Sequence, residues 1–384
     1  MKRVLAAAVL LFIGLSLIAP TAASAAEPSG FEYFHTYAEA ADAIDAAVAD
    51  HPNLARKFSI GQSYHGRSIW AIKLTADIGA GNHDRPEVVI QAAMHGRERA
   101  AAELAVYMID ELTDKYGDAS TTVGRRVTAI LDTTVIYIVP MLNPDGAVYD
   151  FKGGVFHNWR KNRQAIPGSS EIGIDLNRNF GFKWGCCGGS SGNPASYTYR
   201  GPSPWYTPED VAFRSFVNSR IVDGEQRITA MIGVHSAARR VLYPYGYTTV
   251  NVPSTMTTAD HKVLVALANG MAQRNGYPAE QSSDLYITDG ESDDWAYHAH
   301  GIFSLTLELS KGSARRYYPS LSELTADLAR NRPAVLWFLE QADCPYRVAG
   351  LGAEFCGAGS AMQSINLAEG NRTATLARAG RSIN

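Results

Sequence analysis

The sequence lacks a strong excess of charge of either sign. It has 35 lysines and arginines against 38 aspartates and glutamates over 384 residues, a formal net charge of −3 at pH 7. Because nucleic-acid binding normally needs a strongly basic surface, the composition gives no electrostatic reason to expect a nucleic-acid partner. Charged residues make up 19% of the chain and hydrophobic residues 46%, which excludes a disordered chain and allows a sizeable core.

The sequence also lacks a long apolar run beyond its N-terminus. There, Lys2 and Arg3 precede 16 apolar residues (4–19), and the small residues Ala-Ser-Ala follow at 23–25. This order is typical of a secretory signal peptide cleaved near residue 25. A membrane anchor is the alternative, but the run is shorter than the roughly 20 residues that a spanning helix needs. We therefore expect residues 1–25 to be removed and the chain to be secreted, without a membrane partner.

Cysteine is scarce. The four cysteines are Cys186, Cys187, Cys344 and Cys356. Export permits disulfides, and the last two can close a short loop. The adjacent pair can bond to each other or to the C-terminal two, and the sequence does not choose between these pairings. The spacing fits no common zinc-binding pattern, so we do not expect a cysteine zinc site.

Strand-like and helix-like segments alternate along the chain. Strands are predicted at 68–74, 87–93, 133–142, 228–234 and 302–309, and helices at 36–50, 98–116, 208–220, 259–275 and 321–340. The alternation predicts an α/β sheet with helices on both faces. Long Gly-, Ser- and Pro-rich loops lie between residues 149 and 228, and loops of this length are usually functional. We expect one domain over 26–342 and a loosely ordered extension over 343–384.

Four polar residues lie near the ends of predicted strands. His95 follows one strand, His235 follows another, and Glu308 lies near the end of a third. In open α/β sheets the ligand site lies at the carboxyl ends of the strands. Glu98 is three residues after His95, so the two side chains can share a face and hold one cation, with His235 as the third ligand of a catalytic zinc. The alternative for His95 and Glu98 is an ordinary ion pair at the start of a helix.

Glu308 interrupts an otherwise apolar strand. Burial of an unpaired carboxylate is costly, so this residue needs an explanation. It is either a glutamate on an edge strand that faces water, or a general base that faces a metal-bound water.

Two arginine-containing motifs lie in the loop region, WRKNR at 159–163 and DLNRN at 175–179. Arginine binds carboxylates with a planar pair of donors, so both motifs are candidates for holding an anionic substrate. The ordinary alternative is that both are solvated surface clusters.

Together these motifs resemble those of the zinc metallocarboxypeptidases of the pancreatic carboxypeptidase A/B type. The resemblance spans about residues 31–341 and keeps the family's order of motifs. The matching segments are HGRE (95–98), NPDG (143–146), WRKNR (159–163), DLNRN (175–179), HS (235–236), YPYGY (243–247), the loop 286–295 and TLEL (306–309). The resemblance implies a mixed, mostly parallel twisted sheet with helices on both faces, and a peptidase that removes C-terminal residues.

The resemblance also implies a role for individual residues. One Zn²⁺ per chain is held by three ligands: His95, Glu98 and His235. Around it, Asp175 orients His95, Glu308 removes a proton from the zinc-bound water and passes it to the leaving amine, and Arg163 stabilises the oxyanion. The substrate's free carboxylate is held by Asn177, Arg178 and Tyr286, and Arg97 belongs to an outer subsite.

The same resemblance suggests a specificity. Asp293, seven residues after Tyr286, occupies the position at the base of the family's side-chain pocket, and Glu291 adds a second acid. An acid at the base goes with lysine and arginine ends, so we predict a preference for basic C-terminal residues. A second activity on apolar ends is expected if the carboxylate stays solvated. The alternative is that Asp293 points at solvent.

The sequence departs from the family pattern in three places. We expect no long inhibitory pro-domain, Ala237 stands where the family often has tyrosine, and the tail after Gln341 has no counterpart in the family. The expected partner is a peptide or protein with a free C-terminus, and we expect the protein to be a monomer.

Two other functions are alternatives to a carboxypeptidase. One is a zinc amidase of related fold, which the intact carboxylate clamp disfavours. The other is a non-catalytic binding protein, which the intact set of metal ligands and general base disfavours.

Overall fold

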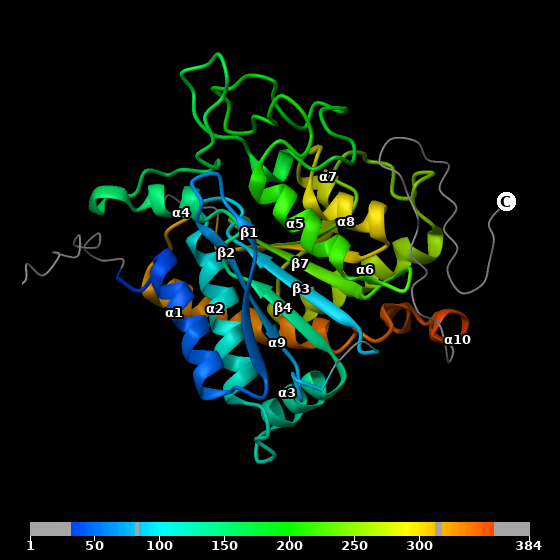
Figure 1. The fold of residues 1–384 in the computed structure, drawn as a ribbon. Helices are drawn as coiled ribbons and strands as arrows, with labels where there is room; N and C mark the ends of the chain where they lie inside the picture. The colour runs from blue at the N-terminus through cyan, green and yellow to red at the C-terminus, as the bar shows by residue number, and fades with distance from the viewer. Residues whose placement is uncertain (1–31, 81–83, 312–316, 357–384) are drawn as a thin grey trace, which may run out of the picture.

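The computed structural model of the chain describes residues 32–80, 84–311 and 317–356. The predicted signal peptide lies outside the described residues. Over the described part, an eight-stranded sheet runs through the molecule with helices packed against it (Figure 1). None of the helices in these ranges is long and apolar enough to cross a lipid bilayer.

The sheet has the strand order β1-β2-β4-β3-β7-β10-β8-β9. The strands are β1 (Ala55–Gln62), β2 (Ser68–Leu74), β3 (Glu87–Ala92), β4 (Val135–Val139), β7 (Ile228–Ser236), β8 (Arg240–Tyr243), β9 (Ala279–Gln281) and β10 (Phe303–Leu309). The four central strands β4, β3, β7 and β10 pair in parallel, as do β8 and β9. Antiparallel pairs join β1 to β2, β2 to β4 and β10 to β8. The predicted mixed, mostly parallel sheet is therefore confirmed.

The helices begin where the sequence offers capping side chains. Thr36, Thr207 and Ser320 each accept a hydrogen bond from the backbone of the first turn that follows. The longer helices are α1 (Tyr37–Asp50), α2 (Arg99–Asp114), α3 (Thr122–Thr133), α5 (Pro208–Ser219), α6 (Thr258–Asn275), α8 (Ser292–His300) and α9 (Leu321–Leu339). The shorter elements are α4 (Pro144–Asp150), α7 (Ser282–Leu285), α10 (Gly352–Phe355), three 3₁₀ turns (Lys152–Gly154, Leu176–Arg178 and Pro345–Ala349) and a ribbon of β5 (Ile221–Val222) with β6 (Glu225–Gln226).

Both faces of the sheet are buried. Successive side chains of a strand point to opposite faces, so Val88 and Ile90 of β3 join the core formed with α2, α6 and α9. Val89 points the other way and joins a second core that contains residues of α5 and α8. Because helices cover both faces, the carboxyl ends of the central strands are left as the place for a ligand.

The carboxyl ends of three parallel strands meet at one edge of the sheet. In the pairing of β7 with β10, His235 lies opposite Glu308. β3 lies on the other side of β7 and leads into the loop that carries His95. The long segment between α4 and α5, drawn as green loops at the top of Figure 1, contributes further residues to the site described below.

The structure chooses between the open cysteine pairings. One disulfide joins the adjacent Cys186 and Cys187, and the other joins Cys344 to Cys356. The second disulfide lies in a segment that packs on the core, where the buried Tyr346 donates to Asp260 Oδ1 at 2.5 Å. The prediction that everything after residue 342 is loosely ordered is therefore wrong for 343–356, because the disulfide and Tyr346 fix this segment. Residues 357–384 lie outside the described ranges.

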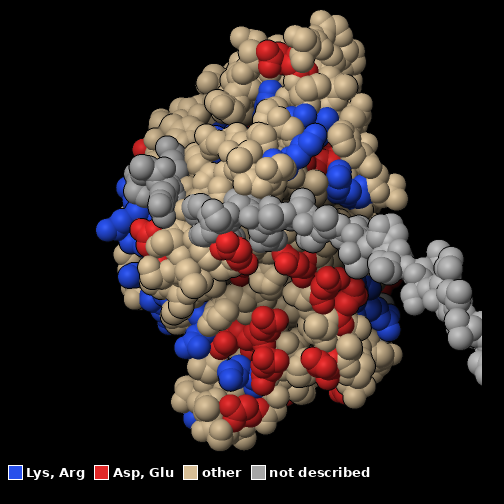
Figure 2. Space-filling model, turned by 90° about the vertical axis from the view of Figure 1, so that its left-hand side faces the viewer, with Lys and Arg blue, Asp and Glu red and all other residues tan. Residues whose placement is uncertain are grey.

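Acidic side chains gather on the face of the molecule formed by α1 and α2 (Figure 2). The exposed acidic residues of these helices are Glu39, Asp42, Asp45, Asp50, Asp110 and Asp114. Exposed carboxylates of this kind stay solvated, so the face is locally acidic although the net charge of the whole chain is only −3.

Candidate metal centre and substrate cavity

The loop between β3 and α2 carries the first two predicted ligands. It runs so close to the first turn of α4 that a Cβ atom on Gly96 would overlap the backbone of Gly146. Asn143 holds the two segments together, since its Nδ2 donates to the carbonyl oxygens of Met94 (3.0 Å) and Lys161 (3.1 Å). The HGRE and NPDG motifs therefore form one packed unit, and only glycine fits at position 96.

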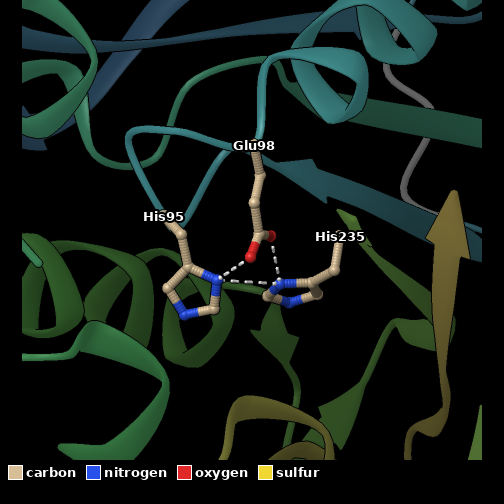
Figure 3. A group of neighbouring side chains, drawn as sticks. All are labelled: His95, Glu98 and His235. Atoms are coloured by element: carbon tan, nitrogen blue, oxygen red, sulfur yellow. Dashed lines mark hydrogen bonds and ion pairs between the residues drawn. The ribbon is translucent and has the colours of Figure 1, made fainter. Parts of the chain in front are cut away.

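His95, Glu98 and His235 converge in the structure (Figure 3). His95 Nδ1 lies 2.8 Å from Glu98 Oε1, and His235 Nδ1 lies 3.0 Å from Glu98 Oε2. The two Nδ1 atoms are 3.3 Å apart. All three side chains are at least 97% buried. Two ring nitrogens and a carboxylate thus face one point inside the protein.

The donor set fits a divalent metal ion. His95 Nε2 lies 3.1 Å from Asp175 Oδ1, so the proton of this imidazole belongs on Nε2 and the lone pair of Nδ1 faces the centre. Two imidazole nitrogens at 3.3 Å with a shared carboxylate match the nitrogen and oxygen ligands that zinc takes in catalytic sites. Burial would raise the pKa of Glu98, but the charges of His95 and His235 hold it well below its ordinary value.

Glu308 stands beside this centre. It is the register partner of His235 in the adjacent parallel strand, so its side chain reaches the same edge of the sheet. Its Oε2 atom is buried and has no hydrogen-bond partner among the described residues. Burial, together with the negative charge of Glu98, raises the pKa of Glu308 to about 7. The carboxyl group is thus able to take up and release a proton near neutral pH.

The arginine at the centre is Arg160, and the prediction that assigned Arg163 to this place is wrong. Arg160 Nε donates to Asp175 Oδ2 at 2.9 Å, and its guanidinium lines the cavity beside the metal ligands. The guanidinium of Arg163 instead lies over the rings of Tyr149 (3.6 Å) and Trp159 (4.4 Å). The physical reason is the buried carboxylate of Asp175, which pairs with the first arginine of the motif and leaves the second to stack on aromatic rings.

Asp175 connects the arginine to the metal centre. Its Oδ1 accepts from His95 and from the backbone N–H of Asn177 (3.1 Å each), and its Oδ2 accepts from Arg160. Burial would raise the pKa of Asp175, but the charges of Arg160 and His95 hold it well below its ordinary value. One carboxylate therefore orients both a candidate ligand and a candidate catalytic guanidinium.

Three predicted carboxylate-binding residues lie on the same cavity: Asn177, Arg178 and Tyr286. Arg178 is 99% buried, and its Nη2 atom has no hydrogen-bond partner in the described part of the chain. Its Nη1 donates to the Asn177 carbonyl oxygen (2.5 Å), and Asn177 Oδ1 accepts from the Ser292 N–H (3.0 Å). A buried guanidinium with a free donor needs an anion. Tyr286 lies on the wall of the same cavity and is 53% exposed.

The cavity joins the metal centre to these anion-binding groups. Its wall is formed by His95, Glu98, Arg160, Asn177, Arg178, His235, Leu242, Ser282, Leu285, Tyr286, Thr288, Glu291, Thr306 and Glu308.

Glu291, rather than Asp293, supplies a carboxylate on the wall of the cavity. Asp293 is 95% buried and accepts a hydrogen bond from the hydroxyl of Thr306, which lines the cavity in its place. Burial raises the pKa of Asp293 to about 6. Glu291 Oε1 lies 3.2 Å from Arg178 Nη1, and its Oε2 accepts from Thr288 Oγ1 at 2.6 Å. Two predictions for Asp293 are therefore wrong: its side chain does not face solvent, and it does not form part of the cavity wall.

Arg97 does not line the cavity. Its guanidinium lies over the ring of Tyr317 (4.1 Å) and near that of Tyr197 (5.4 Å), and its Nη1 donates to Asn158 Oδ1 at 3.4 Å. The arginine is therefore held outside the cavity, between aromatic rings of two separate loops.

Sequence reasoning missed Arg160 as the arginine of the centre. The motif contains both arginines three residues apart, and no property of the sequence alone separates them. The choice follows from the structure, in which the buried Asp175 needs a cationic partner in addition to the histidine it orients.

An α/β sheet edge with this donor set, an adjacent carboxylate and buried guanidinium groups defines a class: a hydrolase with one metal ion that acts on an anionic substrate. A sequence profile described as zinc carboxypeptidase matches residues 40–334. A zinc carboxypeptidase of Saccharothrix mutabilis subsp. capreolus is 39% identical over 333 residues, which cover 84% of this chain and 73% of that protein. Carboxypeptidase A1 of Bos taurus is 33% identical over 279 residues, covering 72% of this chain and 62% of that protein.

Solved structures show the same fold. Bovine thrombin-activatable fibrinolysis inhibitor, solved in complex with tick carboxypeptidase inhibitor, has a TM-score of 0.69 at 25% sequence identity, covering 80% of this chain and 97% of that chain. The carboxypeptidase A of Helicoverpa armigera has a TM-score of 0.67, covering 84% and 75%. The chain therefore belongs to the zinc carboxypeptidase family, whose members are hydrolases that act as exopeptidases.

Proposed function

We propose that the protein binds one Zn²⁺ through His95, Glu98 and His235 and hydrolyses the C-terminal peptide bond of peptides and proteins. One observation carries this proposal: the metal-binding donor set shares a cavity with Arg178, whose buried Nη2 donor has no acceptor among the residues that the structure describes. A free chain end supplies a carboxylate that can accept from this Nη2 donor, and an internal peptide bond does not. The cavity thus favours the last residue of a chain.

In the proposed mechanism, the protein holds the substrate before it moves a proton. Arg178 donates to the terminal carboxylate, with Asn177 and Tyr286 as further donors on the same wall. Zinc, when bound, polarises the scissile carbonyl and makes water more acidic. Glu308 accepts a proton from the attacking water and delivers it to the departing amine nitrogen, for which a pKa of about 7 is well suited.

Arg160 is the residue that we assign to the developing charge. Its guanidinium lies on the cavity wall, with Nη1 3.8 Å from Glu98 Oε1, and Asp175 fixes its orientation. A donor fixed in advance stabilises the negative charge on the carbonyl oxygen without having to reorganise during the reaction.

The experiment that tests the function combines metal analysis with peptide cleavage. We expect the purified protein to contain one zinc per chain and to release C-terminal residues from short peptides, with loss of activity on chelation and recovery with Zn²⁺. In the Glu308→Gln variant we expect the zinc to remain and the rate to fall roughly 10²–10⁴-fold. Glu340→Gln is a matched control, because Glu340 pairs with Arg126 outside the cavity. An unchanged rate in Glu308→Gln would overturn the proposal.

We further propose a preference for lysine and arginine ends, together with activity on apolar ends. The basic preference is supported by the carboxylate of Glu291 on the cavity wall, with Asp293 beneath Thr306, and the apolar activity by Leu242 and Leu285. A buried acid pairs with a substrate cation and is left unpaired by an apolar side chain.

Comparison of hippuryl-Arg with hippuryl-Phe tests this specificity. We expect Glu291→Gln to lower kcat/KM for hippuryl-Arg about tenfold relative to hippuryl-Phe, since the loss of one charge on the wall removes about one such pairing. The matched variant Asp293→Asn, which changes the acid beneath the wall, should have the smaller effect. A wild-type preference for phenylalanine of tenfold or more would refute the basic preference.

We also propose that the protein is exported. The N-terminal order of two basic residues, an apolar run and a small-residue site supports this, as do the two disulfides. Mass analysis of the protein from the culture medium should find a mature N-terminus close to residue 26. A chain retained in the cells with its first residues intact would contradict export.

A further inference from the structure

The bond between the adjacent Cys186 and Cys187 lies in a part of the molecule that the proposed reaction does not use. Both cysteines are exposed, in the loop segment between the 3₁₀ turn Leu176–Arg178 and α5. This placement contrasts with Cys344 of the other disulfide, which is 92% buried. A disulfide open to solvent is accessible to reagents and is a poor candidate for a purely structural clamp.

Hydrogen bonds connect this loop to the substrate cavity. The backbone N–H groups of Cys187 and Gly189 both donate to Asp289 Oδ2, at 3.2 and 3.0 Å. Asp289 is fully buried, so its carboxylate depends on these donors. On the other side of the same residue, the Gly189 carbonyl oxygen accepts from Arg178 Nε at 3.0 Å. Two residues, Asp289 and Gly189, thus join the disulfide to the arginine that faces the cavity.

Glycines make up much of the backbone of this loop. Gly185 and Gly188 have positive φ angles of 63° and 83°, and Gly189 packs so closely on Thr288 that a Cβ would overlap the Thr288 backbone. Glycines lose more conformational freedom on folding than any other residue, so a glycine-rich loop is easily loosened. A bond between neighbouring residues closes a small covalent ring and removes much of that freedom at Cys186 and Cys187.

The position of Arg178 depends on this loop. Its Nη1 bonds to Asn177 and Glu291, its Nε bonds to Gly189, and its Nη2 is the donor without a partner in the described residues. The Gly189 carbonyl therefore fixes the Nε edge of the guanidinium and, with it, the direction of Nη2. A loop that moved by a fraction of an ångström would misdirect this donor.

We propose that the Cys186–Cys187 disulfide, through Gly189 and Asp289, positions Arg178 for the free carboxylate of the substrate, so that reduction of this bond weakens substrate binding. The inference rests on the proposed function. Reduction by a dithiol proceeds by attack of a thiolate on one sulfur, which breaks the protein disulfide. The second thiol then releases the protein, leaving two cysteine thiols and an oxidised cyclic disulfide.

The expected signature is a change in KM without a change in kcat. The carboxylate is held by Arg178 before and during the reaction, so weaker positioning removes binding that the ground state and transition state share. Loss of a well-placed charged hydrogen bond corresponds to a rise in KM of roughly tenfold. The metal ligands and Glu308 are untouched, so kcat and zinc content should stay within about twofold.

The experiment compares Cys186→Ser/Cys187→Ser and Asp289→Asn with the wild type, using hippuryl-Arg as substrate and zinc analysis of every sample. Asp289→Asn reaches the same loop without touching a cysteine, and it decides the question if the cysteine variant fails to fold. Wild type treated with a phosphine reductant, which breaks the exposed disulfide without a dithiol's affinity for zinc, is the third arm. Cys344→Ser/Cys356→Ser is the control for loss of a disulfide elsewhere.

A rise in KM of about tenfold in both loop variants, with zinc content and kcat retained, would support the positioning role. A KM within twofold of wild type in both, or a loss confined to kcat, would overturn it. Failure of the proposed function is distinguishable, because the wild type itself would then release no C-terminal residue.

Discussion

Two regions of the active site are built in different ways. The strand-edge group lies on β7 and β10 or in the loop that joins β3 to α2, and its members are His95, Glu98, His235 and Glu308. The loop group, Arg160, Asn177, Arg178, Tyr286 and Glu291, is carried by segments outside the sheet. Strand register places His235 and Glu308, and the packed loop after β3 places His95 and Glu98, whereas the side chains of the second group depend on hydrogen bonds between loops. The proposed metal ligands and general base thus lie at the end of the sheet, and Arg160 and the substrate-recognition residues lie on the loops.

After the substitution of Glu308, the substitution of Arg160 should have the largest effect on activity. We expect Arg160→Ala to lower kcat roughly 10²–10³-fold, because it removes the donor for the charge that develops on the carbonyl oxygen. Arg163→Ala, the matched variant three residues away, should change kcat less than about threefold, since its guanidinium packs on Tyr149 and Trp159 outside the cavity. Steady-state kinetics with hippuryl-Arg measures both.

A greater loss of activity in Arg163→Ala than in Arg160→Ala would contradict the assignment of Arg160 to the developing charge. The loop group would then adopt a different arrangement with substrate bound, and the structure's choice between the two arginines would be reversed.

Asp175 connects the strand-edge group to the loop group, and its substitution should have the next largest effect, a loss of zinc affinity. We expect Asp175→Asn to weaken zinc binding roughly 10–100-fold, because it removes the negative acceptor that orients His95. Competition with a chromophoric chelator measures the zinc dissociation constant without any need for activity. Asp150→Asn is a matched control: Asp150 is also fully buried, yet it accepts from Tyr318 and Trp159, away from the metal centre. Equal zinc affinity in the two variants would contradict the role of Asp175.

The smallest expected effect is on the free energy of unfolding, and it comes from the contact of His35 with α2, the helix that follows Glu98. His35 Nδ1 lies 2.6 Å from Glu103 Oε2 on α2, and this hydrogen bond raises the pKa of His35 although burial opposes it. The resulting stabilisation is fully present below the unfolded pKa of roughly 6.5 and is lost as pH rises through the raised folded value. His35→Gln should lower the free energy of unfolding by about 0.5 kcal/mol at pH 5.5, since the pair is partly exposed.

Urea denaturation at pH 5.5 and pH 9 measures this difference. The variant and the wild type should differ less at pH 9, where the histidine is neutral in both states. A larger difference at pH 9 than at pH 5.5 would give the opposite sign and contradict the assignment.

The sequence predicted that His95, His235 and Glu308 lie at one edge of the sheet, because continuous apolar runs mark the buried strands and the carboxyl ends of parallel strands meet at one edge. The residues alone left an ordinary ion pair open for His95 and Glu98, and the family resemblance favoured the metal ligands. The predicted strand at 68–74 agrees with β2, and the one at 228–234 lies within β7. β1, with its half-exposed ARKFSIGQ sequence, was not predicted, since edge strands lack a continuous apolar run. α3 was not predicted either, because its mixed polar sequence has little helical signal.

The loop group was predicted less well. Its residues were named through a family resemblance, and the resemblance does not decide which of two nearby arginines or acids faces the cavity. Arg160, rather than Arg163, lines the cavity because it pairs with Asp175, which is distant in sequence. Glu291, rather than Asp293, lines the cavity because Thr306 covers Asp293. Contacts of this kind follow from how the loops pack and are absent from local sequence patterns.

Zinc K-edge X-ray absorption on the purified protein, combined with anomalous diffraction, tests the proposed metal centre most directly. We expect a single zinc site per chain with two imidazole nitrogens at about 2.0–2.1 Å and a carboxylate from Glu98, and the anomalous peak between His95 and His235. A zinc ion located elsewhere, or a spectrum without histidine ligands, would contradict it.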